Sequence, residues 1–178
     1  IDEADFVACH NQAYVNQYDL LCGLKDKGIF LFNTQWNQEE LNTNLPAAMK
    51  RYLAEHQIEF YIINATDIAE NMGLGNRINM IMQSAFFKLA KVIPLEQAVG
   101  YMKEAVEHTY GKKGEKIVAL NNDAIDRGIT ALEKVVIPPH WKDAKDNLAV
   151  KLEDKPDFIT QVLEPMSRQE GDKLAVST

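Results

Sequence analysis

The sequence predicts an α/β fold of three layers, in which a short parallel sheet of βαβαβ order carries an added helical half and an extended C-terminal strap. Three short apolar runs alternate with segments of helical periodicity, which is the pattern of strands joined by helical crossovers. The runs are residues 5–9, 29–33 and 59–65. Right-handed crossover connections would make these three strands parallel.

The start of the chain supplies the first two strands. Residues 5–9 (DFVAC) form a continuous apolar run, which is typical of a parallel strand buried on both faces. Apolar residues then recur every three or four positions from 14 to 22, which predicts a helix that ends at Gly23. Residues 25–28 (KDKG) predict a turn, and residues 29–33 (IFLFN) predict the second strand.

The second connection begins with a polar stretch at residues 38–40. Pro46 is well placed as the first residue of a helix, because its missing N–H needs no partner in the first turn. The apolar residues of this helix share one face: Met49, Tyr52 and Leu53. Residues 59–65 (EFYIINA) predict the third strand.

Residues 66–136 predict the added helical half, because their periodicity is helical almost throughout. Apolar positions support three helices, near residues 80–89, 95–106 and 125–136. Residues 116–120 (KIVAL) are compatible with a strand, but we interpret them as the start of a helix.

Two consecutive prolines end the helical region. We therefore expect an α/β domain over residues 1–137, truncated on its N-terminal side, and a strap or linker over residues 138–178. The strap is charged and its apolar residues are isolated. Ordering a separate domain costs about 1–2 kcal/mol per residue. We therefore expect the strap to pack on the first domain through Trp141 and Phe158.

The composition excludes several classes of protein. Hydrophobic residues make up 46% of the 178 residues and charged residues 25%, which is ordinary for a globular protein. No apolar run approaches the roughly 20 residues that cross a bilayer, and a net charge of −7 disfavours nucleic-acid binding. Cys9 and Cys22 lie in apolar runs, which predicts buried, unreactive thiols in a reducing compartment. Two cysteines are too few for a four-iron cluster, which needs about four, and no spacing indicates a metal site.

One loop has residues suited to binding a ligand. Gly73 and Gly75 would let the backbone approach a ligand closely, just before a predicted helix. Asn76 could cap that helix, and Arg77 could bind a phosphate or a carboxylate. From the residues alone, a structural loop with a capping Asn and a surface Arg is favoured. The loop follows the third strand instead of the first, and it has no Walker lysine.

Other polar residues favour structural roles. His10 ends the first strand at the carboxyl edge, where open α/β sheets bind ligands, but it is better explained as a cap of the next helix. Asn121 and Asn122, at an expected helix start, are caps first and polar ligand contacts second. Asp123 and Asp126 fit a charged helix face better than an acid/base pair. No catalytic arrangement is recognisable.

Five stretches, in the same order, resemble the pyruvate:ferredoxin (flavodoxin) oxidoreductase family and together span nearly the whole chain. They are residues 4–12, 28–34, 75–87, 121–126 and 165–174. The stretch GNRINMIMQSAFF is the most specific of them. The resemblance implies an enzyme that decarboxylates pyruvate on thiamine diphosphate, passes electrons through 4Fe–4S clusters to ferredoxin or flavodoxin, and releases acetyl-CoA.

Within that family, the chain resembles the central gamma-type domain, which lies between the two thiamine-site domains and helps to seat CoA. The resemblance implies that thiamine diphosphate, Mg and the 4Fe–4S clusters belong to other parts of the full-length enzyme and none to this fragment. It also implies a cytoplasmic homodimer in anaerobic metabolism. A glycine-rich strand and turn would precede this chain, and a ferredoxin-like domain would follow it. We therefore expect the isolated chain to be inactive.

The candidate CoA-binding residues implied by this resemblance are Gly73, Gly75, Asn76, Arg77, Asn79, Asn121 and Asn122. Two alternatives remain. A stand-alone nucleotide-binding α/β enzyme would need a phosphate loop after the first strand, where this sequence has His10-Asn11-Gln12 and no glycine. A purely structural spacer domain would bind no ligand at the 73–79 loop.

Overall fold

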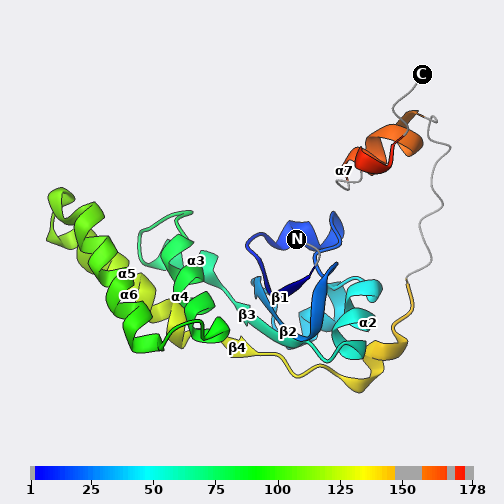
Figure 1. The fold of residues 1–178 in the computed structure, drawn as a ribbon, viewed down its shortest axis with the longest axis horizontal. Helices are drawn as coiled ribbons and strands as arrows, with labels where there is room; N and C mark the ends of the chain where they lie inside the picture. Colours follow the sequence, from blue (N-terminus) through cyan, green and yellow to red (C-terminus); the bar gives the residue numbers. More distant parts are fainter. Residues whose placement is uncertain (1–2, 147–157, 168–170, 175–178) are drawn as a thin grey trace.

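A computed structural model describes residues 3–146, 158–167 and 171–174 (Figure 1). Its sheet has four strands in the order β1-β2-β3-β4, and their bounds are Ala4–Cys9, Leu24–Asn33, Glu59–Ile63 and Glu133–Lys134. β1, β2 and β3 are parallel, whereas the two-residue β4 runs antiparallel to β3. The predicted α/β fold with a short parallel sheet is confirmed.

The connection between β1 and β2 differs from the expected helix. It contains only a short 3-10 helix, η1 (Gln12–Asn16). Tyr14 and Tyr18 supplied much of the periodicity, but Tyr14 is 42% exposed and the two rings pack on each other. Val15 and Leu21 are buried, and their separation of six residues does not form a helical stripe.

β2 begins five residues earlier than expected. Residues 25–28, predicted as a turn, form an irregular insertion within β2, where the register shifts between the pairs Ala4–Leu24 and Phe6–Ile29. Lys27 has a positive φ of 60° there, and its N–H is bonded to the carbonyl of His56.

The connection between β2 and β3 contains two helices, α1 (Gln38–Asn44) and α2 (Ala47–Glu55). α1 replaces the expected polar connection, and a capping box of Asn37 and Glu40 begins it. Pro46 occupies the N-cap of α2, one residue before the predicted position. β3 ends two residues early, because Asn64 caps the following helix.

The helical half comprises four helices, whose bounds are α3 (Ala65–Asn71), α4 (Asn79–Ala90), α5 (Leu95–Tyr110) and α6 (Glu115–Thr130). A short 3-10 helix, η2 (Gly111–Lys113), joins α5 to α6. Residues 116–120 do begin a helix, as interpreted. α6 ends at Thr130, six residues before the expected end, because the chain returns to the sheet as β4. In Figure 1, α4, α5 and α6 lie together at one end of the sheet.

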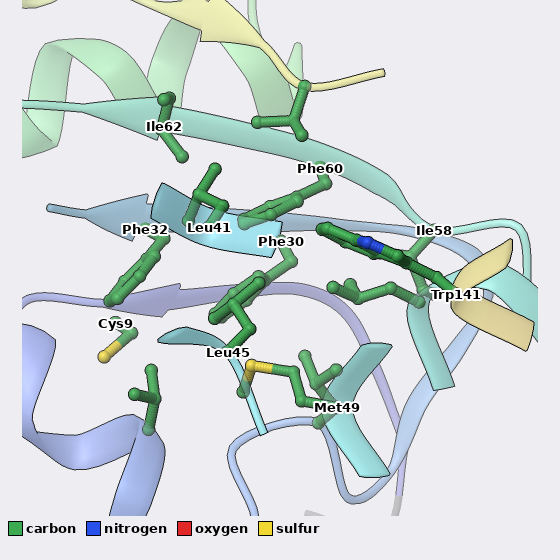
Figure 2. Packing of buried hydrophobic residues seen from close by; sticks show 14 of the residues in the cluster. Cys9, Phe30, Phe32, Leu41, Leu45, Met49, Ile58, Phe60, Ile62 and Trp141 are labelled. Carbon is green, nitrogen blue, oxygen red and sulfur yellow. The ribbon is translucent and has the colours of Figure 1, made fainter. Parts of the chain in front are cut away.

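Two hydrophobic clusters lie on opposite faces of the sheet, because side chains alternate along each strand. Phe30, Phe32 and Phe60 face α1, α2 and Trp141 (Figure 2). Leu31 and Ile63 face α3, α4 and α6. A smaller cluster of Met102, Val106, Val118 and Ile125 joins α5 to α6. The sheet is thus the middle of three layers, as expected.

The segment after β4 is fastened to α1 and α2. Trp141, in the 3-10 helix η3 (Pro139–Asp143), is 1% exposed, and its Nε1 donates to Asn42 Oδ1 at 2.7 Å. Arg51 binds the carbonyl of Ala144 and the carboxylate of Asp146. Residues 147–157 of the expected strap lie outside the described residues.

The last described residues form short helical turns, with bounds η4 (Ile159–Leu163), α7 (Glu164–Ser167) and η5 (Gly171–Lys173). Phe158 is 62% exposed, so the expectation that it packs on the domain is wrong. Its immediate neighbours in sequence carry no buried cluster of their own among the described residues. The domain boundary at residue 137 stays a prediction. Within the described ranges, no helix is both long and apolar enough to cross a membrane.

Candidate functional site

The carboxyl ends of the three parallel strands meet in a network of hydrogen bonds centred on Asn33, the last residue of β2. Its Nδ2 donates to the carbonyl of His10 at 3.0 Å and to Thr66 Oγ1 at 3.2 Å, and its Oδ1 accepts from the N–H of Ala65 at 2.9 Å. Asn33 is 5% exposed. One buried amide therefore links the end of β1, the end of β2 and the start of α3.

Gln12 extends this network on the solvent side. Its Oε1 accepts from the Thr34 hydroxyl and, at 3.1 Å, from the N–H of Gln35. The Gln35 amide donates in turn to Asp67 Oδ1 at 3.1 Å, and Asn64 holds the same carboxylate. The polar side chains are thus positioned by one another as well as by the strands.

These residues surround the strand-end hollow, a cavity of about 340 Å³ at the carboxyl edge of the sheet. Its lining comes from the ends of β1 and β2, the start of α3 and the 72–78 loop: His10, Asn11, Gln12, Asn33, Thr34, Gln35, Thr66, Asn76 and Ile78. Open α/β sheets bind ligands outside the carboxyl ends of their strands. The position and the polar lining together make the hollow the candidate site.

Gly73 and Gly75 give the 72–78 loop its shape. Their φ angles are +77° and +58°, in the left-handed region that favours glycine. A Cβ at either position would meet nothing within 4 Å. Glycine is therefore required here by the backbone conformation and not by close packing against another part of the chain. Asn76 follows them and lines the hollow.

Two expectations for this loop need correction or refinement. Asn76 does not cap α4, because α4 begins three residues later at Asn79, and its N-cap position is Ile78, with no capping side chain. Arg77 turns back on its own loop, where Nε donates to the carbonyl of Leu74 at 2.9 Å. Only Nε is bonded in this way, and the Arg77 side chain is exposed.

Asn79 lines a second cavity beside the hollow, which we call the β1 groove. Its volume is about 340 Å³, and its lining is Phe6, Ala8, His10, Asn79, Met82, Gln83 and Phe86. Phe6 and Phe86 form an edge-to-face pair with centroids 5.0 Å apart. His10 lines both cavities, so the polar hollow and the mostly apolar groove adjoin.

Asn121 and Asn122 lie elsewhere. They occupy the middle of α6 and no helix start, which corrects the sequence interpretation, because α6 already begins at Glu115. Asn121 is 8% exposed, and its Nδ2 donates to the carbonyl of Ile117 at 2.8 Å. The buried Oδ1 of Asn122 has no hydrogen-bond partner among the described residues. Neither residue lines the strand-end hollow or the β1 groove.

The remaining sequence candidates have structural roles. Asp123 pairs with Arg127 at 3.1 Å and Asp126 with Lys103 at 2.8 Å, which confirms a charged helix face. His10 does not cap η1, because Asn11 does so by accepting from the N–H of Ala13.

The two cysteines differ in burial. Cys9 is buried, its Sγ–H donates to the carbonyl of Asn11, and burial raises the pKa of this thiol. Cys22 is exposed, which corrects the expectation that both are buried, because the helix predicted to shield it does not form. In the part of the chain that the structure describes, no three His, Cys, Asp or Glu side chains are grouped to hold a metal ion.

Of the nine residues that line the hollow, the sequence analysis weighed only His10 and Asn76 as site residues. The polar residues that it missed are Asn11, Gln12, Asn33, Thr34, Gln35 and Thr66. A signal for them was present: polar residues follow each of the three apolar runs directly. In a parallel sheet these positions meet at one edge, so polar residues that follow successive strands are expected to converge there.

Comparison with known proteins places the chain in a family. Residues 1–131 match the family model described as "Pyruvate ferredoxin/flavodoxin oxidoreductase", and residues 145–178 match a model described as a domain of unknown function. The chain is 55% identical over 177 residues to a pyruvate-flavodoxin oxidoreductase of Enterobacter agglomerans. It is 50% identical over 178 residues to a pyruvate:ferredoxin oxidoreductase of Moorella thermoacetica.

These relatives are much longer proteins. The alignments cover 99% and 100% of this chain, but only 15% of each relative. Among solved structures, pyruvate oxidoreductase subunit PORC from Thermotoga maritima superposes with a TM-score of 0.59 at 19% identity. The superposition covers 75% of this chain and 66% of PORC, and supports the fold alone. By the family match over most of its length and its close relatives, the chain belongs to the pyruvate ferredoxin/flavodoxin oxidoreductase family.

Proposed function

We propose that this chain is part of an enzyme that converts pyruvate and CoA to acetyl-CoA and CO2 and passes electrons to ferredoxin or flavodoxin. The names of the relatives that are 50–55% identical support this reaction class. Because the chain spans 15% of their length, thiamine diphosphate, Mg and the 4Fe–4S clusters would bind other parts of the full-length protein. The full-length enzyme would be a cytoplasmic homodimer.

Within that enzyme, this domain would help to seat CoA and would bridge the thiamine-site domains. The observation that supports this role is the position of Asn76, which lies on a glycine-shaped loop and lines a polar hollow at the carboxyl edge of the sheet. The side-chain amide of Asn76 makes no hydrogen bond to the described residues, so it is available to a ligand. Asn79 would contact CoA from the adjoining β1 groove.

A structural spacer is the second candidate, and specific observations favour it. Arg77 Nε is bonded within its own loop and Asn121 Nδ2 within its own helix, so two of the candidate CoA-binding residues already have a structural partner. A spacer would hold its neighbouring domains in register and would leave the hollow without a ligand. The family match makes the third alternative, a stand-alone nucleotide-binding enzyme, the weakest of the three.

The proposal is tested by Asn76→Ala in the full-length enzyme. One neutral hydrogen bond contributes about 0.5–1.5 kcal/mol, so the KM for CoA should rise about two- to tenfold. The KM for pyruvate should stay the same, because pyruvate reacts at the thiamine site. The matched control is Asn71→Ala, which removes an exposed amide near the end of α3 that lines neither cavity.

If the KM for CoA stays at the wild-type value in Asn76→Ala, the spacer function is favoured. If the KM values for CoA and for pyruvate rise by the same factor, Asn76 lies outside the CoA site, and this result would also contradict the proposal. The isolated chain should show no pyruvate-dependent reduction of a viologen dye, since thiamine and cluster sites would lie in the other domains.

A further inference from the structure

A helical segment near the end of the chain has an apolar face. Residues 158–167 are helical without a break, from η4 into α7. Apolar residues there follow the spacing i, i+3, i+4 and i+7 from Ile159, with Phe158 beside them, which places them on one face of the helix. We call this face the C-terminal stripe, and its members are Phe158, Ile159, Val162, Leu163 and Met166.

The C-terminal stripe is largely exposed. The exposed fractions of Phe158, Leu163 and Met166 are 62%, 44% and 58%. The main contacts of α7 are with η4 and η5, and in Figure 1 this segment lies apart from the sheet and its helices. Exposed apolar residues that are scattered singly are ordinary, but several on one helix face mark an interaction surface.

The segment is also too short to form a core of its own. Residues 145–178 match a family model separate from that of residues 1–131. Domains shorter than about 40 residues usually need disulfides, metals or a partner surface to fold. This stretch contains no cysteine, and its described residues include no group of His, Cys, Asp and Glu that could hold a metal ion. A partner surface is the remaining way to bury the stripe.

The charge of the segment favours a protein partner over a membrane surface. A helix that lies on a membrane normally carries Lys and Arg on its polar face, where they attract anionic lipid. Residues 156–167 contain no Lys or Arg, and their charged residues are Asp157 and Glu164. An amphipathic helix without basic residues instead suits an apolar groove on a folded domain.

The partner must lie near the place where the segment leaves the sheet and its helices. Asp146 is held there by Arg51, and the chain from Asp146 to Phe158 can span at most about 40 Å. The relatives contain a counterpart of this segment, because the alignments cover 99% and 100% of the chain, and the chain is only 15% of their length. The rest of such a polypeptide is therefore the nearest source of a folded partner.

We propose that residues 158–166 form a docking helix, whose C-terminal stripe is buried in an apolar groove on another domain of the same full-length polypeptide. The inference rests on the proposed function only in that this chain is part of a larger enzyme, and it requires no CoA. The helix would fix that domain relative to the sheet, since Trp141 and Arg51 fasten the preceding segment to α1 and α2.

The test uses the full-length enzyme. A photo-cross-linking phenylalanine, p-benzoylphenylalanine, at position 158 should cross-link within a single polypeptide, to a peptide outside residues 1–178. Leu163→Asp should make the amides of residues 159–164 exchange hydrogen at least about tenfold faster, because a charged side chain cannot stay buried in the groove. Gln161→Asp is the matched control, since it adds the same charge at an exposed position outside the stripe and should leave this exchange unchanged.

Four results would overturn the inference. A cross-link to residues 1–178 of the same polypeptide would place the stripe on this chain, and a cross-linked product of doubled mass would assign it to a second copy. Binding of the wild-type enzyme to phosphatidylcholine–phosphatidylglycerol vesicles that Leu163→Asp abolishes would assign it to a membrane. If no cross-link forms, or if the Leu163→Asp and Gln161→Asp enzymes exchange at the same rate, the stripe is not buried in a groove.

Failure of this inference can be told apart from failure of the proposed CoA binding. The C-terminal stripe lines neither the strand-end hollow nor the β1 groove. The KM for CoA in Asn76→Ala therefore tests the proposed function whatever the cross-link shows.

Discussion

The two faces of the sheet are packed in opposite ways. Toward α1 and α2, large aromatic rings fill the core, and Phe30 and Phe60 stack with centroids 5.4 Å apart (Figure 2). Toward α3, α4 and α6, small residues let the helices approach closely: Ala65, Ala69, Ala85, Ala124 and Gly128. The first core depends on side chains that are large, and the second on side chains that are small. A large-to-small substitution should therefore destabilise the core toward α1 and α2, and a small-to-large substitution the core toward α3, α4 and α6.

The aromatic core is completed by a residue distant in sequence. Trp141 comes from a segment that neither family model covers, since the matches are residues 1–131 and 145–178. It is nevertheless 1% exposed and lies against α2 and the sheet (Figure 2). The segment between the two matched stretches is thus part of the first core.

The largest effect is expected for Trp141→Ala. The substitution leaves a large cavity in the aromatic core and removes the donor to Asn42, so the free energy of unfolding should fall by about 3–5 kcal/mol. Trp141→Phe should lose distinctly less, because it keeps an aromatic ring and His140 Nε2 still lies 3.0 Å from Asn42 Oδ1. Urea unfolding of the chain measures both. Equal losses in the two variants would show that the hydrogen bond, and not the packing, matters most.

An intermediate effect is expected for Gly128→Ala in the small-residue core. A Cβ at Gly128 would overlap Ser84 Oγ and the carbonyl oxygen of Ile81 on α4, so α4 and α6 must move apart. Overpacking of this kind costs about 1–3 kcal/mol of unfolding free energy.

Gly100→Ala is the matched control for Gly128→Ala. Gly100 lies within α5, and a Cβ there meets nothing within 4 Å. The control should stabilise the protein by about 0.5–1 kcal/mol, because alanine favours a helix more than glycine does. If both substitutions stabilise the chain in thermal unfolding, the close contact between α4 and α6 is not present in solution.

The three parallel strands were predictable because each reads as an apolar run. The expectation that residues 5–9 are buried on both faces was wrong, because β1 lies at the edge of the sheet and only Cys9 in it is buried. The helical interpretation of residues 116–120 was also correct. The capping box at Asn37 and Glu40 was a readable signal for α1 that the sequence analysis did not use. β4 was not predictable, because only its pairing with Tyr61 and Ile62 defines this two-residue strand.

The site was predictable in part. The glycine loop reaches the carboxyl edge of the sheet, as a loop that follows a strand and a short helix can. The position of Asn121 was not, because the packing of α6 against α4 and α5 determines which face of α6 is buried. Asn33 carries no sequence signal for its central role. Its three partners come from His10, Ala65 and Thr66, and only the aligned strand ends bring them together.

The smallest effect is expected where the sheet is most exposed, at the ion pair between β3 and β4. Lys134 Nζ lies 3.0 Å from Glu59 Oε2, and hydrogen bonds from Lys134 and then from Tyr61 lower the pKa of Glu59 from its ordinary value of 4.5. A carboxyl group with a lowered pKa in the folded state stabilises the protein above its unfolded pKa. That stabilisation is lost as the pH falls through the pKa that the carboxyl group has in the folded state. Both side chains are exposed, so solvent screens most of the interaction.

Glu59→Gln should therefore lower the melting temperature slightly at neutral pH, and the difference from the wild type should vanish as the pH falls well below 4.5. Thermal unfolding from pH 7 down to about pH 3 measures this, since that window spans ordinary Glu titration. Glu55→Gln is the control, because that exposed carboxylate forms no ion pair among the described residues. A difference that persists unchanged at the lowest pH would mean that Glu59 holds β4 by packing or by neutral hydrogen bonds. In that case packing, and not the ion pair, would stabilise the edge of the sheet, as packing stabilises its two cores.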